Sequence, residues 1–447
     1  MSKKICKVAH QDQHVNSATI TQIPGDKSIS HRAVILASLS DQPITITNFL
    51  ASEDCLNTAN IFRQLGIQIT QNADNTLVVH GKGMHGLTES RDLLDVGNSG
   101  TSIRLLTGLL SAQSFKSTIA GDDSIARRPM KRVIDPLSQM GAKITGQALP
   151  GKTDTYPPLT INGTSQLQGI HYTMPVASAQ VKSAILLAAL FATTATTLIE
   201  KKPSRDHTER MFETFGVDIK RDGNVIHMMP PSQLKLPNHN HIHVPSDFSS
   251  AAFFLVLGAV IPGLTLTLTN IGLNPTRSAL IDVLRKMNAN IHVTPKLSDG
   301  AEPMGDITVT GGILTNIDVP SEVIPIIIDE IPILSVAALL AKGTMRIHNA
   351  EELRVKESDR IAGIVQLIQA IGGQVEETPD GFSTHSLTTP QDFHYDAGHD
   401  HRMAMSAIIL AIATGVKAEV KGCDYIATSF PNFFDILKSL DIRFSLE

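Results

Sequence analysis

The chain has 447 residues, of which 42% are hydrophobic and 18% charged, with a formal net charge of −5 at pH 7. This length exceeds one small domain and fits about three average domains, or two of more than ~200 residues. The low aromatic content of 4%, with no Trp, and the slightly acidic charge exclude a nucleic-acid surface built on stacked bases and basic residues. We therefore expect no nucleic-acid partner, and any anionic ligand should be small and held by a local group of Lys and Arg.

The sequence indicates a cytoplasmic protein. Cys6, Cys55 and Cys423 show no CxxC spacing and no disulfide framework, which is typical of a reducing compartment. The first fifteen residues contain lysines but no apolar core of a signal peptide. The longest apolar run, 251–261, is too short to cross a bilayer, so we expect no membrane contact.

One pattern recurs six times along the chain: an amphipathic helix, a helix-breaking residue and a short strand. The breakers are 75, 75, 72, 84 and 69 residues apart, and Gly and Asn suit the left-handed position that ends a helix better than Asp does. They are Gly66, Gly141, Gly216, Asn288, Gly372 and Asp441.

A second, more apolar helix lies upstream of each amphipathic one. Helices that are apolar on most faces are buried, so we expect these six to form the core and the amphipathic six to cover it. The core helices are expected within 31–39, 102–112, 179–191, 249–260, 332–341 and 402–413. Stretches rich in β-branched residues, at 43–49, 265–271, 344–349 and 418–423, predict strands between them.

Six βαβαββ-like units, each too small to bury its own apolar face, must pack on one another. Two clusters of three units fit the domain-size range, and a closed ring of six is the alternative. With two clusters, the boundary falls in the Pro- and His-rich stretch 230–247. Its alternating His239, His241 and His243 have no Cys or carboxylate at ligand spacing, which favours a solvated linker over a metal site.

The loops before the core helices contain the polar residues that a ligand would need. Gly, Ser, Asn and Asp there supply helix caps, and exposed N–H groups favour anions. Cations follow within a turn, where the helix dipole disfavours them, so we expect a shared polyanionic ligand. These cations are Lys27, Arg32, Arg104, Lys182 and Arg402. Neither a phosphate-binding P-loop nor a GxGxxG dinucleotide motif is present, since Thr21 and Asp26 occupy the P-loop glycine positions.

Two further charged stretches, 122–132 and 352–360, open amphipathic helices. We expect solvated positions for Arg127, Lys131, Arg132 and Arg354. In the second stretch Lys356 and Arg360 are spaced i, i+4 and are predicted to share a helix face, with Glu357 between them. Cations around Glu357 would keep it ionised, while burial would favour a general acid. Asp329 and Glu330 interrupt an apolar run, where carboxylates are costly unless they are hydrogen-bonded or functional.

Six motifs, in this order, resemble the 5-enolpyruvylshikimate-3-phosphate synthase family, in its second sequence class. They are GDKSISHR (25–32), GNSGTSIR (97–104), RRPM (127–130), ASAQVKSA (177–184), RVKESDR (354–360) and DHRMAM (400–405). The resemblance implies an α/β fold, a two-lobed inside-out α/β barrel. The upper lobe would span 23–244 and the lower lobe 1–22 plus 245–447, with three units each and an active site between them that closes on substrate.

The resemblance also implies the residues of the site. Shikimate 3-phosphate would be bound by Lys27, Ser28, Arg32, Ser178, Gln180, Arg205, Asp329 and Lys356. Phosphoenolpyruvate would be bound by Lys27, Asn98, Gly100, Arg128, Gln180, Arg360 and Arg402. Asp329, Glu357 and Lys27 would be catalytic, with Asp329 as the base near the 5-hydroxyl and the other two moving a proton on and off the methylene carbon. Arginine suits this site because its planar fork binds carboxylate and phosphate at two points.

The implied reaction transfers the enolpyruvyl group of phosphoenolpyruvate to shikimate 3-phosphate, without metal or organic cofactor, and we expect a monomer. Gly100 predicts that glyphosate competes with phosphoenolpyruvate, whereas Thr428 stands where many members have a lysine. The related UDP-N-acetylglucosamine enolpyruvyl transferases are the enzyme alternative, but they typically have a loop Cys that this chain lacks. A non-catalytic or RNA-binding repeat protein would not need Asp329 and Glu357 beside cationic loops.

Overall fold

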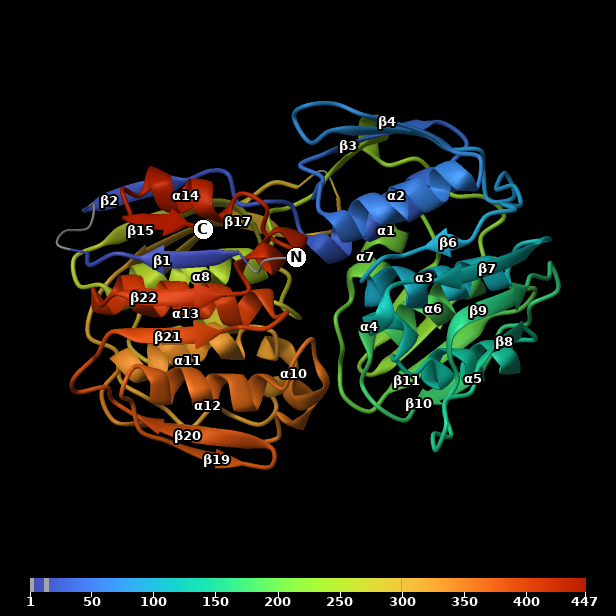
Figure 1. Cartoon of the computed structure of the whole chain (residues 1–447). Coiled ribbons are helices and arrows are strands. Elements are labelled where there is room, and N and C mark those ends of the chain that lie inside the picture. The colour runs from blue at the N-terminus through green and yellow to red at the C-terminus, as the bar shows by residue number, and fades with distance from the viewer. Residues whose placement is uncertain (1–3, 12–15, 299) are drawn as a thin grey trace. The chain divides into compact units, whose positions relative to one another are not determined.

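The computed structural model describes residues 4–11, 16–298 and 300–447, which form two compact units (Figure 1). Lobe A contains Gly25–Val244 and Ser298–Glu302. Lobe B contains the chain up to Pro24, Pro245–Leu297 and Pro303–Glu447. The division differs from the expected one in two places: the first crossing follows Pro24 rather than residue 22, and Ser298–Glu302 group with lobe A. The second difference arises because Ala301 and Glu302 bond to helix α7 of lobe A.

Three apolar inner helices form the centre of each lobe, as predicted. In lobe A they are α1 (Lys27–Ser38), α3 (Gly100–Ser111) and α6 (Ala179–Ala189). In lobe B they are α8 (Phe248–Val260), α11 (Ile331–Leu340) and α13 (His401–Thr414). Nearly every side chain of α8 and α11 is buried, which explains why these segments show no polar face in the sequence. The two lobes have separate hydrophobic cores.

The amphipathic helices lie on the outside of the cores. They are α2 (Glu53–Gln64), α5 (Lys131–Gln139), α7 (His207–Thr214), α9 (Leu280–Lys286), α12 (Arg360–Ala370) and α14 (Phe433–Ser439). All six predicted breakers have positive φ, between 57° for Asp441 and 100° for Gly141, so the expected left-handed helix ends are confirmed. Short helical turns add α4 (Asp123–Ala126), α10 (Ile324–Ile327), η1 (Asn238–Asn240), η2 (Glu351–Val355) and η3 (Cys423–Thr428).

The described strands form six small sheets, three in each lobe. In lobe A their orders are β14-β3-β5-β4, β6-β7-β9-β8 and β10-β11-β13-β12, and in lobe B β16-β17-β15-β2, β18-β20-β19 and β21-β22-β1-β23. The lobe A strands are β3 (Pro43–Thr47), β4 (Gln68–Gln71), β5 (Leu77–His80), β6 (Leu94–Asp95), β7 (Lys116–Ala120), β8 (Lys143–Gln147), β9 (Tyr156–Asn162), β10 (His171–Met174), β11 (Thr196–Glu200), β12 (Ile219–Asp222), β13 (Val225–Met228) and β14 (His241–His243). Those of lobe B are β1 (Ile5–Val8), β2 (Ser17–Ile20), β15 (Thr265–Gly272), β16 (Asn290–Lys296), β17 (Met304–Thr310), β18 (Thr344–Ile347), β19 (Val375–Thr378), β20 (Gly381–His385), β21 (Phe393–Asp396), β22 (Ala418–Lys421) and β23 (Phe444–Leu446).

At each crossing the last strand before the chain leaves a lobe pairs within that lobe. Strand β2 precedes α1 in the chain but pairs in parallel with β15 of lobe B, while β14 precedes α8 but pairs in parallel with β3 of lobe A (Figure 1). The prediction of a solvated linker for His241 and His243 is therefore wrong: both lie in β14, and Thr47 Oγ1 is 2.9 Å from His241 Nε2 and 3.1 Å from His243 Nδ1. Pairing with β3 supplies the backbone bonds that a linker would leave to water.

A close helix crossing in lobe A gives a test of this packing. A Cβ atom on Gly108 of α3 would lie 2.1 Å from the carbonyl oxygen of Ala184 in α6. We expect Gly108→Ala to force the helices apart and to lower the free energy of unfolding by about 1–3 kcal/mol in urea titrations. Gly312→Ala is the control, because a Cβ there would meet no atom within 4 Å. Equal stability of the two variants would contradict the packing argument.

Candidate active site

The N-terminal turns of the three inner helices of lobe A hold a group of polar side chains. Each helix begins at a side-chain cap: Asp26 accepts from the N–H of Ile29 at 2.9 Å, Ser99 from that of Ser102 at 3.1 Å and Ser178 from that of Val181 at 3.4 Å. We call the predicted site residues of this lobe, together with Arg104, the lobe A cluster. It consists of Lys27, Ser28, Arg32, Asn98, Gly100, Arg104, Arg128, Ser178, Gln180 and Arg205.

Arg32 links α1 to α6 and α7 inside this cluster. Its Nε donates to Thr208 Oγ1 at 2.7 Å, its NH2 to Ser183 Oγ at 2.6 Å and its NH1 to the carbonyl of Ser28 at 2.8 Å. Burial is the main cause that lowers the pKa of the Arg32 guanidinium to about 10; the charge of Arg205 acts in the same direction, and nearby carboxylates oppose it. Arg32 and Arg205 are thus neighbouring cations that a dianionic ligand would stabilise.

A second group of cations surrounds the start of α3. Arg104 NH1 donates to the carbonyl of Gly100 at 3.0 Å and to Gln180 Oε1 at 2.7 Å. A Cβ on Gly100 would lie 2.6 Å from Arg128 NH1 and 2.9 Å from Arg104 NH1, so only glycine lets both guanidiniums approach this closely. Burial, with repulsion from Arg128 and Arg132, lowers the pKa of Arg104 to about 10. A bound anion would relieve this repulsion.

The remaining polar groups of the lobe A cluster are held by neighbouring side chains. Lys27 Nζ forms an ion pair with the buried Asp54, and Asn98 Nδ2 donates to Asp122 Oδ2 at 2.6 Å. Gln180 Nε2 donates to Thr101 Oγ1 at 3.1 Å, which ties α6 to α3. These contacts fix the orientation of side chains that would otherwise have several rotamers.

In lobe B, Arg360 is at the centre of a group of carboxylates. Its side chain is 1% exposed; Nε lies 2.8 Å from Asp400 Oδ2, NH2 2.7 Å from Glu357 Oε2 and NH1 3.3 Å from Asp329 Oδ1. We call Asp329, Lys356, Glu357, Arg360, Asp400 and Arg402 the lobe B cluster. One guanidinium therefore holds three carboxylates through its three nitrogens, which fixes their relative positions.

The charge states in the lobe B cluster follow from this arrangement. Burial alone would raise the pKa of Glu357, but the Arg360 guanidinium and His401 outweigh it and hold that pKa well below its usual range. Burial would likewise raise the pKa of Asp400, but the charge of Arg360 outweighs burial and lowers this pKa. Burial and the charge of Arg402 lower the pKa of His401 to about 4. The lowered pKa of Glu357 favours an ionised carboxylate there at neutral pH.

Asp329 lies in the turn between α10 and α11 and faces several cations. Its carboxylate oxygens are 3.8 Å from Arg277 NH1 and 4.0 Å from Lys356 Nζ, besides the contact with Arg360. Arg402 NH1 donates to the Asp329 carbonyl at 3.2 Å. The neighbouring Glu330 is wholly buried, accepts a hydrogen bond from Ser249 and lies 4.0 Å from Arg402, so it serves the packing of this turn.

Three expectations about the cations need correction. Lys356 and Arg360 do not share a helix face, because Lys356 follows η2 with extended backbone and α12 begins at Arg360; both nevertheless reach Asp329. Residues 122–132 do not open one helix, since α4 ends before Arg127 and α5 begins at Lys131. Lys182 is fully buried against Glu200 and Glu209 instead of facing a ligand.

Sequence reasoning missed several residues that support the site. Arg277 is 4% exposed and approaches Asp329, but no motif surrounds it. The only signal for Asp400 in the sequence is its position as a helix cap, and the only signal for Asp54 is its position in the first turn of α2. Thr428, at the position of the missing lysine, donates to the carbonyl of Tyr425 at 2.7 Å.

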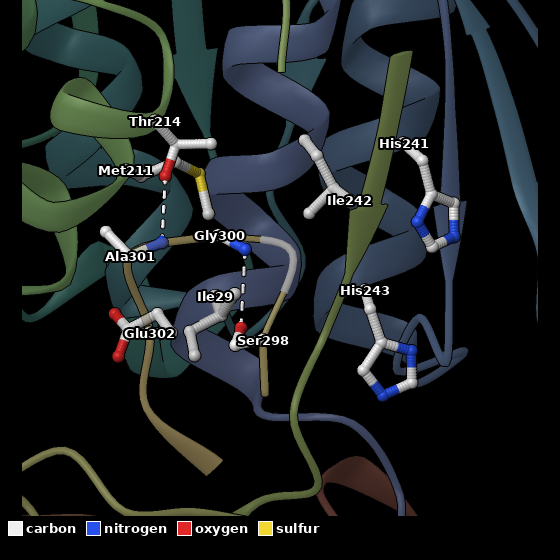
Figure 2. Close-up of a pocket in the computed structure, with 10 residues that line it drawn as sticks. All are labelled: Ile29, Met211, Thr214, His241, Ile242, His243, Ser298, Gly300, Ala301 and Glu302. Atoms are coloured by element: carbon white, nitrogen blue, oxygen red, sulfur yellow. Dashed lines mark hydrogen bonds between the residues drawn. The ribbon is translucent and has the colours of Figure 1, made fainter. Parts of the chain in front are cut away.

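A pocket in lobe A is lined by a different set of residues (Figure 2). They are Ile29, Met211, Thr214, His241, Ile242, His243, Ser298, Gly300, Ala301 and Glu302. In Figure 2 the N–H of Ala301 donates to Thr214 Oγ1, at 3.2 Å. The pocket contains no predicted site residue, so it is not the candidate active site.

The described part of the chain contains no group of three or more His, Cys, Asp or Glu side chains arranged to hold a metal ion. Among the helices of the described residues, none combines the length and apolar character needed to cross a bilayer.

The Arg360–Asp400 pair gives a stability prediction. The folded-state pKa of Asp400 lies below its ordinary value of 3.8, so the stabilisation by this ionised carboxylate is present above that pH and is lost as pH falls through the lowered pKa. We expect Asp400→Asn to lower the free energy of unfolding by about 3 kcal/mol at pH 7, and the difference from wild type to shrink on acidification towards pH 3 in urea titrations. Asp359→Asn, which removes the charge from an exposed cap, should cost under about 1 kcal/mol. A difference that does not change with pH would contradict the linkage.

Comparison with known proteins identifies the family of the chain. The family model for EPSP synthase (3-phosphoshikimate 1-carboxyvinyltransferase) matches residues 11–437. The 3-phosphoshikimate 1-carboxyvinyltransferases of Bacillus cytotoxicus and Bacillus subtilis are 46% and 45% identical, each over 94% of this chain and 96% of the relative. The solved EPSP synthase of Acinetobacter baumannii superposes with a TM-score of 0.90 at 38% identity, covering 99% of this chain and 100% of that one.

A more distant solved structure shares the fold alone. The enolpyruvyl transferase NikO from Streptomyces tendae has a TM-score of 0.76 at 14% identity, covering 100% of this chain and 99% of that one. The family match over almost the whole chain, with relatives at 45% identity, goes further than the fold. The chain belongs to the EPSP synthase, or 3-phosphoshikimate 1-carboxyvinyltransferase, family.

Proposed function

We propose that the lobe A and lobe B clusters act on the same two substrates. As a member of its family, the enzyme transfers the enolpyruvyl group of phosphoenolpyruvate to the 5-hydroxyl of shikimate 3-phosphate, giving 5-enolpyruvylshikimate 3-phosphate and phosphate on the pathway to chorismate. The observation that carries the assignment of residues is the contact of Asp329 and Glu357 with one guanidinium, that of Arg360. This shared cation supports the proposal that Asp329 and Glu357 act together, as a base and a proton acceptor.

Shikimate 3-phosphate is bound by side chains around α1, α6 and α7 in this proposal. The close cations Arg32 and Arg205 hold its phosphate, since their mutual repulsion favours a dianion. Lys27, Ser28, Ser178 and Gln180 contribute donors from the helix N-termini, where the backbone N–H groups also favour anions. From lobe B, Lys356 and Asp329 act on this substrate, with Asp329 at the 5-hydroxyl.

Phosphoenolpyruvate is bound where the guanidiniums crowd the start of α3. Arg128 and the backbone of Gly100 bind its anionic groups, with Asn98, Gln180 and Lys27 beside them. Arg360 and Arg402 of lobe B bind the remaining charge. The short distance from a Cβ on Gly100 to Arg128 supports competition by glyphosate, because a second small anion requires the same guanidinium and the same space.

The proton steps follow from the charge states. Asp329 takes the proton of the 5-hydroxyl as its oxygen attacks C2 of phosphoenolpyruvate, and the Lys27 ammonium protonates the methylene carbon, giving a tetrahedral intermediate. Phosphate then leaves, and the ionised Glu357 removes a proton from the methyl group to form the enol ether. The lowered pKa of Glu357 supports a proton-accepting role in this second step. Positioning and fixed charges supply the rate without a metal or an organic cofactor.

The remaining parts of the proposal concern partners and location. The proposed ligands are small anions, and no nucleic acid or membrane is involved. The enzyme acts as a monomer, because each cluster is built from residues of a single lobe of one chain. A cytoplasmic location is supported by the three cysteines, which are buried and unbonded.

The substrate assignment is tested by phosphate release. We expect phosphate to be released from phosphoenolpyruvate when shikimate 3-phosphate is added and not when UDP-N-acetylglucosamine is added, because the clusters offer cations for a second compact anion. Reactions lacking either acceptor are the control. Release with the nucleotide sugar would instead assign the chain to the related transferases.

The catalytic roles are tested by two charge-removing substitutions. We expect Asp329→Asn and Glu357→Gln each to lower kcat by about 10²–10⁴-fold with folding intact, because each removes a proton acceptor. Glu352→Gln is the matched control: Glu352 pairs with Lys356 at 2.8 Å but is 63% exposed and outside the proposed mechanism. Near-normal turnover of both variants would refute the assigned roles.

A further inference from the structure

The buried cation Lys182 is not used by the proposed mechanism, although it lies in the first turn of α6 beside Gln180. Its side chain and that of Glu200 are fully buried, and Glu209 is 7% exposed. The Lys182 ammonium donates to Glu200 Oε2 at 3.1 Å and to the carbonyl of Ser204 at 3.3 Å, and it forms an ion pair with Glu209 Oε1 at 2.7 Å. A lysine this buried is costly unless its charge is paired and hydrogen-bonded, and Lys182 has both kinds of contact.

The same contacts close the loop between β11 and α7. Glu200 ends β11, and its Oε1 accepts the N–H of Ser204 at 3.1 Å as well as the Ser204 hydroxyl proton. Lys182 holds the Ser204 carbonyl, so Ser204 is fixed through its N–H, its hydroxyl and its carbonyl. The residue after it is Arg205, proposed to bind the phosphate of shikimate 3-phosphate.

The loop is held at its other end too. Asp206 precedes α7 and accepts from Arg210 Nε at 2.9 Å. In the first turn of α7, Glu209 pairs with Lys182, and Thr208 Oγ1 lies 2.7 Å from both Ser183 Oγ and Arg32 Nε. Two successive residues of α6 thus bond to two successive residues of α7, and this polar seam joins the loop of Arg205 to Arg32.

We propose that Lys182 is a positioning residue for shikimate 3-phosphate, which sets the loop of Arg205 against the N-terminus of α6. The inference rests on the proposed site, because it acts through Arg205. In this role Lys182 affects the affinity for shikimate 3-phosphate and takes no part in the proton steps. Residues that position a charged group affect binding because small displacements of that group weaken its contacts.

The test uses a charge-balanced pair of substitutions, since removing Lys182 alone would leave two buried carboxylates facing one cation. We expect Lys182→Met with Glu209→Gln to raise the KM for shikimate 3-phosphate about tenfold or more, while kcat and the KM for phosphoenolpyruvate change less than about threefold. Folding is checked by circular dichroism and urea titration. If this variant does not fold, Lys182→Gln with Glu209→Gln replaces it, with the same expectation, because glutamine keeps a neutral donor but cannot reach Ser204.

The matched control is Arg221→Met with Glu209→Gln. Arg221 NH2 lies 3.2 Å from Glu200 Oε2, so this control removes the other cation of the same cluster and leaves the contact of Lys182 with Ser204 intact. We expect its three kinetic constants to stay within about threefold of wild type. An equal rise in the KM for shikimate 3-phosphate would mean that charge balance, not the loop, is responsible, and would overturn the proposal.

Arg205→Ala separates this inference from the site assignment. We expect it to raise the KM for shikimate 3-phosphate, and the Lys182 and Glu209 substitutions to add less than about threefold in its background, because both act on one contact. If Arg205→Ala raises this KM but the Lys182 variant does not, only the positioning role is wrong. If Arg205→Ala has no effect, both the site assignment and the positioning role are wrong. If the effects of Arg205→Ala and of the Lys182 and Glu209 substitutions on this KM multiply, the proposal is also overturned.

Discussion

The constraint on which this structure depends is that one βαβαββ unit cannot cover its own apolar inner helix. A helix such as α8, buried along nearly its whole length, needs neighbours on every side, and these are supplied by two further inner helices and three surrounding sheets. Packing the inner helices together also brings their N-terminal turns together, as the bonds from Gln180 to Arg104 and Thr101 show. The site is thus a by-product of how the core is buried, because helix N-termini favour anions.

The two clusters meet the problem of buried charge in different ways. In lobe A, Arg32 and Arg104 have lowered pKa values, because burial and neighbouring cations oppose their charge. In lobe B the pKa of Arg360 is raised, since its carboxylate partners outweigh burial. Lobe A therefore holds stored repulsion that an anion relieves, whereas lobe B has fixed ion pairs that keep Glu357 and Asp400 ionised. Binding and proton transfer are divided accordingly in the proposed mechanism.

Much of this could be predicted from the sequence, because it depends on periodicity and on local caps. The inner helices, the covering helices and all six left-handed helix ends follow from the spacing of apolar residues and of Gly, Asn and Asp. Contacts between distant segments could not be predicted that way. The burial of Lys182 depends on Glu200 and Glu209, Arg277 reaches Asp329 from a loop without a motif, and His241 lies in a strand only because β3 offers an edge. The prediction that Lys356 shares a helix face with Arg360 is wrong because η2 ends before α12 begins.

Pairing between strands that are far apart in the chain affects how the chain folds as it is synthesised. Lobe A lacks its fourth strand in the first sheet until residue 243 has been made, and the segment 298–302 joins it later still. The sheet of lobe B that contains β1 is completed later still, because β1 pairs with β22 and β23, more than 400 residues further along the chain. At about 5–20 residues per second, β1 leaves the ribosome on the order of tens of seconds before its partners exist. Its edges are unpaired for that time, and its sheet is completed only after β22 and β23 have been made.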